Sequence, residues 1–220
     1  MRFLRLKLQG PLQSWGERSR WDSRDTASMP TKSGVIGLIG CCLGYPRGDE
    51  RIRALSSSLH IAVRADRAGV IMTDFHTVQT ESGGFPNAEG GRRSSNNNTI
   101  ITPKQYLQDA DFTVWIWGKE ESLQLCADAL KKPVWTPYLG RKSCVPATPI
   151  LPEWLEAESV DDAIRQDSQH HSEIQIELLP GEPLKQGERL IQRPDELTDA
   201  HRNEYRYRMV RAFSIGGEGS

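Results

Sequence analysis

The 220-residue sequence predicts an α+β protein whose main body is a ferredoxin-like βαββαβ domain. The first observation is the order of patterns over residues 1–132: strand, helix, strands, long polar loop, strand, helix. The second is that 37% of the residues are hydrophobic and 26% are charged, which allows a core beneath a polar surface. The third is that the patterns weaken after residue 150 into acidic, proline-containing sequence. We therefore predict a main domain over 1–149 and a small, acidic, β-rich C-terminal extension over 150–220.

The first strand and the first helix follow from two different periodicities. Leucines alternate with polar residues over 4–8, which predicts a half-buried strand that ends at the Gly-Pro pair 10–11. Apolar residues then repeat at helical spacing over 35–43, and Thr31 or Ser33 is the expected N-cap. This helix carries a glycine at every third position from 34 to 40, although each costs about 1 kcal/mol relative to alanine. Such spacing predicts close approach of another backbone.

The remaining elements are predicted from shorter apolar runs. Strands are expected over 60–64, 70–72 and 112–117, and helices over 49–57 and 122–132. Residues 80–99 are rich in glycine and asparagine, and a polar loop of this length is usually functional or disordered. Strands over 172–179 and 205–215 form a small appendage or add to the main sheet.

Charge is distributed unevenly along the chain, although the formal net charge is only −1. Residues 1–53 carry ten Lys or Arg and five acidic residues, whereas residues 150–220 carry eight and fifteen. Phosphate binding depends on the local field and not on the total charge. The basic N-terminal part could therefore face RNA, with the acidic part facing water or a basic partner.

The cysteines and histidines do not form a metal-binding pattern. Cys41, Cys42, Cys126 and Cys144 show no CxxC spacing, so we expect four buried, reduced thiols, and no metal or cofactor. The sequence contains neither a signal-peptide block nor the roughly 20 apolar residues of a membrane-spanning helix, which favours a cytoplasmic protein.

The segment 135–144 combines the groups that single-stranded RNA requires. Tyr138 offers a ring for base stacking, Arg141 and Lys142 offer cations for phosphates, and Ser143 offers a hydroxyl. Gly140 allows backbone N–H groups to approach a ligand. An ordinary surface turn explains the same residues equally well.

Four segments, in this order along the chain, resemble the CasD family, the type I-E form of the fifth Cas family within the RAMP superfamily. They are Gly10-Pro11-Leu12-Gln13-Ser14-Trp15-Gly16, residues 30–40 (PTKSGVIGLIG), Asp74-Phe75-His76-Thr77, and residues 136–144 (TPYLGRKSC). The match covers roughly residues 1–150. Beyond 150 only the length, the acidity and a final strand near 209–215 are similar.

The resemblance implies a ferredoxin-like (RRM-like) body with a protruding thumb at about 80–99. It also implies a non-catalytic subunit of a Cascade complex that caps and holds the 5′ handle of the CRISPR RNA for antiviral DNA surveillance. Its partners would be the backbone subunit, the large subunit and, through the complex, target DNA, with no membrane.

We interpret ten residues as RNA contacts on this basis. Tyr138, Arg141, Lys142 and Ser143 would hold the handle, Gln13, Ser14, Trp15 and Lys32 would form a second surface, and Arg92 and Arg93 would act from the thumb.

The rival hypothesis is a metal-independent endoribonuclease that processes precursor CRISPR RNA, because a related branch of the same family cuts RNA. Such chemistry needs a base for the 2′-hydroxyl and an acid or cation for the phosphate and the leaving group. His76 and Tyr45, with Lys32 as the cation, are the candidates, but their spacing does not bring them together.

Overall fold

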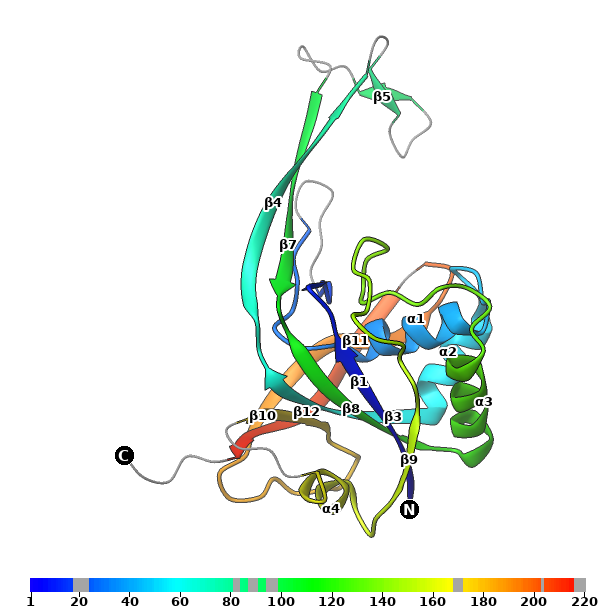
Figure 1. Ribbon diagram of the computed structural model, residues 1–220, viewed down its shortest axis with the longest axis vertical. Coiled ribbons are helices and arrows are strands. Elements are labelled where there is room, and N and C mark those ends of the chain that lie inside the picture. Colours follow the sequence, from blue (N-terminus) through cyan, green and yellow to red (C-terminus); the bar gives the residue numbers. More distant parts are fainter. Residues whose placement is uncertain are drawn as a thin grey trace.

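A computed structural model describes residues 1–17, 24–80, 84–86, 91–93, 99–167, 172–202 and 204–215. The chain is built of antiparallel sheets and few helices, and a two-stranded ribbon projects from its body (Figure 1). No helix in these ranges is long and apolar enough to cross a membrane.

A seven-stranded sheet forms the body, with the order β11-β12-β10-β3-β8-β1-β9 and antiparallel pairing throughout. Its strands are β1 (Arg2–Gln9), β3 (Leu59–Arg67), β8 (Asp111–Gly118), β9 (Glu153–Glu156), β10 (Ser172–Glu177), β11 (Arg189–Asp199) and β12 (Glu204–Ile215). The strands after residue 150 thus extend both edges of the sheet. Of the two arrangements considered for them, added strands are the one found.

Helices cover both faces of this sheet. α1 (Lys32–Cys42), α2 (Glu50–Ser58) and α3 (Glu120–Lys131) pack on the face that receives the alternating leucines of β1, where the larger core lies. α4 (Val160–Arg165) covers part of the opposite face with a smaller cluster around Trp115 and Trp117. The alternation of strand residues supplies an apolar row to each face.

Most predicted elements of the first 150 residues are confirmed to within a few residues. Thr31 is the N-cap of α1, where its hydroxyl accepts a hydrogen bond from the Gly34 amide. All four cysteines are buried and free, as expected. The strand over Thr99–Gln108 was not predicted, and beyond residue 150 the short β9 and α4 and the strand β11 were also missed. β9 has only four residues, and β11 contains Pro194 and a register shift that interrupts its alternation.

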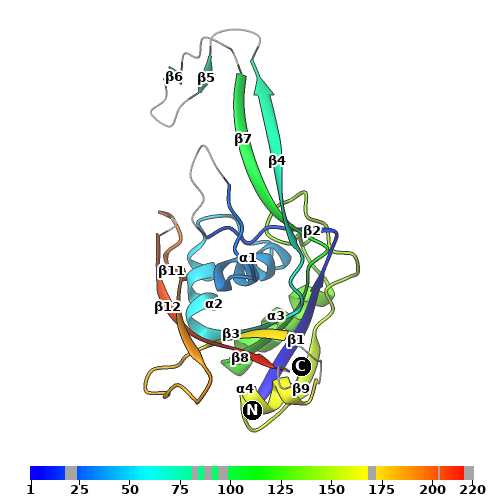
Figure 2. The ribbon, with the colours of Figure 1, turned by 90° about the vertical axis from the view of Figure 1, so that its left-hand side faces the viewer.

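The projecting ribbon, here called the thumb hairpin, consists of β4 (Val70–Gln79) and β7 (Thr99–Gln108). They pair along their whole length, and β2 (Leu12–Gln13) joins the base of β7 (Figures 1 and 2). Beyond the ribbon, β5 (Phe85–Pro86) pairs with β6 (Arg92–Arg93).

The predicted strand over 70–72 was too short, because β4 is largely exposed on both faces. Phe75, for example, is 70% exposed. A strand with few buried residues lacks the alternating pattern that reveals strands. Most of the predicted polar loop over 80–99 lies outside the described residues.

Candidate nucleic-acid interface

A cavity of about 1020 Å³ opens between segments that are distant in sequence. One wall is α1, a second is the connection over 135–145 that follows α3, and a third comes from the turn between β11 and β12. The cavity is large enough to receive part of an RNA strand.

Gly34 and Gly37 of α1 line this cavity, and this part of the helix is here called its floor. A Cβ added at Gly37 would meet nothing within 4 Å, so the helix presents bare backbone to open space there. A Cβ at Gly34 would instead lie 2.7 Å from the ring of Trp15. The predicted close approach of another backbone is therefore not found in the described part of the chain: a tryptophan side chain packs on Gly34, and Gly37 faces open space.

From Tyr138 to Lys142 the connection presents alternate residues to the cavity. Tyr138, Gly140 and Lys142 line it, whereas the side chain of Leu139 is buried in the core. Gly140 has φ +88°, and a Cβ there would lie 1.6 Å from the carbonyl oxygen of Ser14, so only glycine fits. Tyr138 is half-buried, and Lys142 is exposed at the rim. Ser143 is also exposed. A ring and a cation of the predicted site thus share one wall.

Arg141 points away from the cavity. Its guanidinium donates to the carbonyl oxygens of Gln105 (2.9 Å), Arg24 (3.1 Å) and Asp25 (3.2 Å), and it lies 4.7 Å from the centre of the Tyr106 ring. At the sequence level Arg141 and Lys142 were equivalent cations. In the structure they face opposite sides of the connection.

Gln13, Ser14 and Trp15 are buried, and the protein itself uses their polar atoms. Gln13 Nε2 donates to the carbonyls of Leu8 and Ala110 at 3.0 and 2.9 Å, and its Oε1 accepts from Trp15 Nε1 at 3.1 Å. Ser14 Oγ donates to Gln105 O at 3.2 Å. These buried side chains support the cavity and the thumb hairpin, and the prediction that they also contact RNA stays a prediction.

Lys32 is 2% exposed and lies in a buried charge cluster between α1 and the C-terminal strands. Its Nζ contacts Glu177 at 3.1 Å and Glu196 at 2.8 Å. Its backbone N–H donates to Asp195, which also holds Arg208 through two hydrogen bonds. This buried cluster joins α1 to β10, β11 and β12. In this conformation Lys32 is therefore a structural cation.

Carboxylates in buried clusters are held in the ionised form. Burial alone would raise the pKa of Glu177, but its hydrogen bond with His60 and the charges of Lys32 and Arg208 outweigh burial and lower that pKa. On the other face of the sheet, Lys7 and two further donors likewise lower the pKa of Asp66 against its burial.

Arg92 and Arg93 form β6, but their side chains lie outside the described part of the chain. The prediction that they contact RNA therefore stays a prediction.

Sequence reasoning missed several cavity residues. Trp135, 47% exposed, lines the wall next to Tyr138, and Arg47 and Tyr205 line the cavity as well. Tyr45, considered above only for RNA cleavage, also lines it. Partial burial raises the pKa of the Tyr205 phenol above its ordinary value. Trp135 lies inside the quoted segment 135–144 and could have been included. Tyr45 and Tyr205 carry no local signal, because only the fold brings them to one cavity.

The residues nominated for RNA cleavage lie on different elements. His76 is on the thumb hairpin, where it contacts Asp74 at 2.7 Å and Lys104 at 3.1 Å. Tyr45 follows α1 and packs under the guanidinium of Arg51 at 4.0 Å. The third candidate, Lys32, is enclosed by carboxylates. Among the described residues, no group of three His, Cys, Asp or Glu could hold a metal ion.

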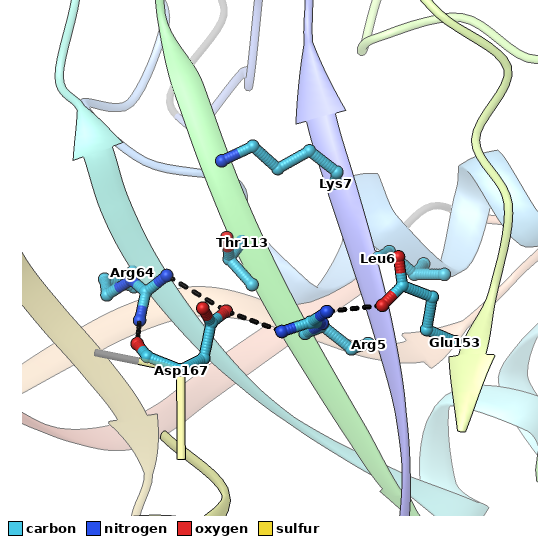
Figure 3. A pocket seen from close by; sticks show the side chains of 7 residues that line it. All are labelled: Arg5, Leu6, Lys7, Arg64, Thr113, Glu153 and Asp167. Carbon is cyan, nitrogen blue, oxygen red and sulfur yellow. Dashed lines mark hydrogen bonds and ion pairs between the residues drawn. The ribbon is translucent and has the colours of Figure 1, made fainter. Parts of the chain in front are cut away.

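A second cavity, of about 200 Å³, lies on the sheet face opposite α1 (Figure 3). Arg5 and Arg64 both contact the carboxylate of Asp167, at 2.9 and 3.2 Å, and Lys7 contacts Asp66 at 2.5 Å. Each cation already faces a carboxylate, so this cavity is better suited to holding strands together than to binding phosphate.

Comparison with known proteins agrees with these features. Residues 3–213 match the family model described as "CRISPR-associated protein (Cas_Cas5)". The chain belongs to this Cas5 family. It is 38% identical over 161 residues to the "CRISPR system Cascade subunit CasD" of Escherichia coli (strain K12), covering 68% of this chain and 69% of that protein. The recognised resemblance to the CasD family is thus confirmed.

Two solved structures share the fold of this Cas5-family chain. One, titled "CRISPR RNA-guided surveillance complex", has a TM-score of 0.72 and 31% identity over 97% of this chain and 89% of the other. The second, titled "Crystal structure of Cas protein", has a TM-score of 0.69 and 30% identity over 98% and 96% of the two chains.

Proposed function

We propose that this chain is a non-catalytic RNA-binding subunit of a type I-E Cascade complex, which caps and holds the 5′ handle of the CRISPR RNA. The observation that carries the proposal is the cavity over Gly37, where bare helix backbone lies between aromatic rings and the exposed Lys142. Rings stack on bases of any sequence, and a rim cation neutralises phosphate.

The relatives support the assembly part of the proposal. One relative is named as a Cascade subunit, and one structural neighbour belongs to an RNA-guided surveillance complex. In a cytoplasmic complex of this kind the chain would contact the backbone and large subunits, and would meet target DNA only through the assembly.

The proposal includes a ferredoxin-like body. β1, the α1–α2 pair, β3, β8, α3 and β9 follow the order βαββαβ, with the thumb hairpin inserted between β3 and β8. Residues 1–149 would be the RNA-binding domain and 150–220 the acidic extension, whose β11 and β12 supply one wall of the cavity.

The experiment is a salt titration of handle-RNA binding with Lys142→Ala and Tyr138→Ala. Loss of one phosphate contact should flatten the slope of log K against log salt by about 0.7. Loss of a stacking ring should cost about 1–3 kcal/mol and leave the slope unchanged. Lys119→Ala, an exposed lysine that does not line the cavity, is the matched control. Parental binding by both cavity variants would place the RNA elsewhere.

The nuclease alternative is tested in the same preparation. Cognate repeat RNA incubated with the protein in EDTA should remain intact. Cleavage at one phosphodiester that His76→Ala abolishes would establish an enzyme.

A further inference from the structure

The base of the thumb hairpin and the cavity wall meet at one guanidinium. Arg141 lies between Gly140 and Lys142, both of which line the cavity, yet its own side chain crosses to the other side of the connection. There it donates to three carbonyl oxygens on two separate segments, residues 24–25 and β7.

These two segments are paired with each other around Arg141. The Gln105 amide donates to Arg24 O at 2.7 Å, and the Arg24 amide donates to Pro103 O at 3.0 Å, so residue 24 runs beside β7. The guanidinium also covers the ring of Tyr106, which is buried.

A second set of contacts fixes the connection itself. The Ser14 amide donates to Leu139 O at 3.0 Å, while Ser14 Oγ donates to Gln105 O. Gly140 packs directly on the Ser14 carbonyl, and the Leu139 amide donates to Cys144 O at 2.8 Å. The connection is therefore held close against β7, and Arg141 is the side chain of the connection that extends to both β7 and residues 24–25.

The chemistry of this position requires arginine. A planar guanidinium carries five N–H donors in a fixed fork and stacks on an aromatic face. A lysine ammonium is a compact charge and cannot bond three divergent carbonyls while covering a ring.

We propose that Arg141 is a positioning residue, which fixes the thumb hairpin relative to the cavity so that an RNA bound over Gly37 also meets the thumb. The inference rests on the proposed function for the RNA-binding part, and on the contacts above for the mechanical part. Arg141 itself touches no RNA.

The test compares Arg141→Lys and Arg141→Ala with Lys142→Ala in the full-length chain. A synthetic RNA of the cognate 5′ handle is titrated at several salt concentrations. Both Arg141 variants should weaken binding by a similar factor, within the roughly 5–150-fold typical of coupling between sites, and keep the parental salt slope. Lys142→Ala should flatten the slope instead. If Arg141→Lys binds like the parent while Arg141→Ala loses affinity and slope, Arg141 is a phosphate contact and the proposal is wrong.

Hydrogen exchange of the RNA-free protein tests the mechanical part separately. Hydrogen bonds to charged groups contribute about 1.5–3 kcal/mol, so the Gln105 and Ser14 amides should exchange about tenfold faster or more in both Arg141 variants. Lys142→Ala should leave them unchanged. Parental exchange in both Arg141 variants would overturn the proposal.

The two measurements separate the possible failures. If the parent binds no handle RNA but the two amides exchange faster in the Arg141 variants, the proposed function is wrong and the positioning of the thumb hairpin by Arg141 is retained. Should Arg141→Ala fail to fold, Arg141→Lys, which keeps the charge and the aliphatic stem, decides both measurements.

Discussion

Replacing Lys32 by methionine should destabilise the free protein severely without changing any RNA contact. The side chain is 2% exposed, and its ammonium lies 3.1 Å from Glu177 and 2.8 Å from Glu196. Methionine has a similar shape and removes the charge. Glu196 then keeps a 3.5 Å contact with Ser56 and the attraction of the Arg208 charge, but no direct ion pair among the described residues.

The expected cost follows from removing the ammonium that lies between the two buried carboxylates. Removing one partner of a buried ion pair costs about 3–5 kcal/mol, against a total stability of about 5–15 kcal/mol for a typical domain. For a chain of this size the melting temperature should fall by about 6–20 °C. Urea unfolding followed by tryptophan fluorescence measures the free energy, because six tryptophans report on the transition.

Two controls make the result specific. Lys142→Met removes an exposed lysine and should change stability by no more than about 0.5 kcal/mol. The double variant Lys32→Met/Glu196→Gln removes the orphaned charge and should recover part of the loss. If Lys32→Met is as stable as the parent and instead flattens the salt dependence of RNA binding, the Lys32 side chain is accessible to RNA and contacts phosphate.

Two further predictions concern pH and the cavity floor. Glu177, Asp66 and Asp161 have pKa values lowered by their ion-pair and hydrogen-bond partners, so they favour the folded state at neutral pH. Because these folded-state pKa values lie below the unfolded ones, their contribution to stability should be complete above about pH 5 and be lost as the pH falls through 4 and below. Acid titration followed by circular dichroism measures this loss. A constant stability down to pH 3 would contradict the prediction. At the floor, Gly37→Ala should raise stability by up to about 1 kcal/mol, whereas Gly34→Ala should lower it because the added Cβ meets the Trp15 ring. Gly37→Leu should fold but bind handle RNA more weakly. Unimpaired binding by Gly37→Leu would exclude the floor from the RNA site.

Elements that bury one face were predictable from the sequence, and elements that bury neither were not. β1 and α3 each present a regular apolar face to the core, which fixes their type and their approximate bounds. The thumb hairpin projects from the body and exposes side chains such as Phe75, so its sequence lacks that regularity. β9 is short, and β11 takes its place in the sheet from its pairing with β12.

The placement of the candidate site residues could be predicted only in part, and the differences have one physical origin. A lysine or arginine side chain is usually exposed, so the sequence alone makes Lys32, Arg141 and Lys142 equally good candidates for phosphate contacts. Their partners decide the matter. Glu177 and Glu196 lie 145 and 164 positions from Lys32, and the carbonyls that hold Arg141 lie up to 117 positions away. Local sequence holds no information about such pairs.

Two cations held by the protein, Lys32 and Arg141, and the exposed Lys142 together define how the cavity is built. Lys32 holds α1 against the C-terminal strands, so it fixes the floor relative to the wall that carries Tyr205. Arg141 holds the connection with Tyr138 against the thumb hairpin. Lys142 is held by neither set of contacts and points to solvent at the rim. Replacing Lys32 or Arg141 should therefore weaken RNA binding only by changing the geometry of the cavity, and the salt dependence of binding should be retained. Replacing Lys142 should weaken RNA binding only by removing a charge.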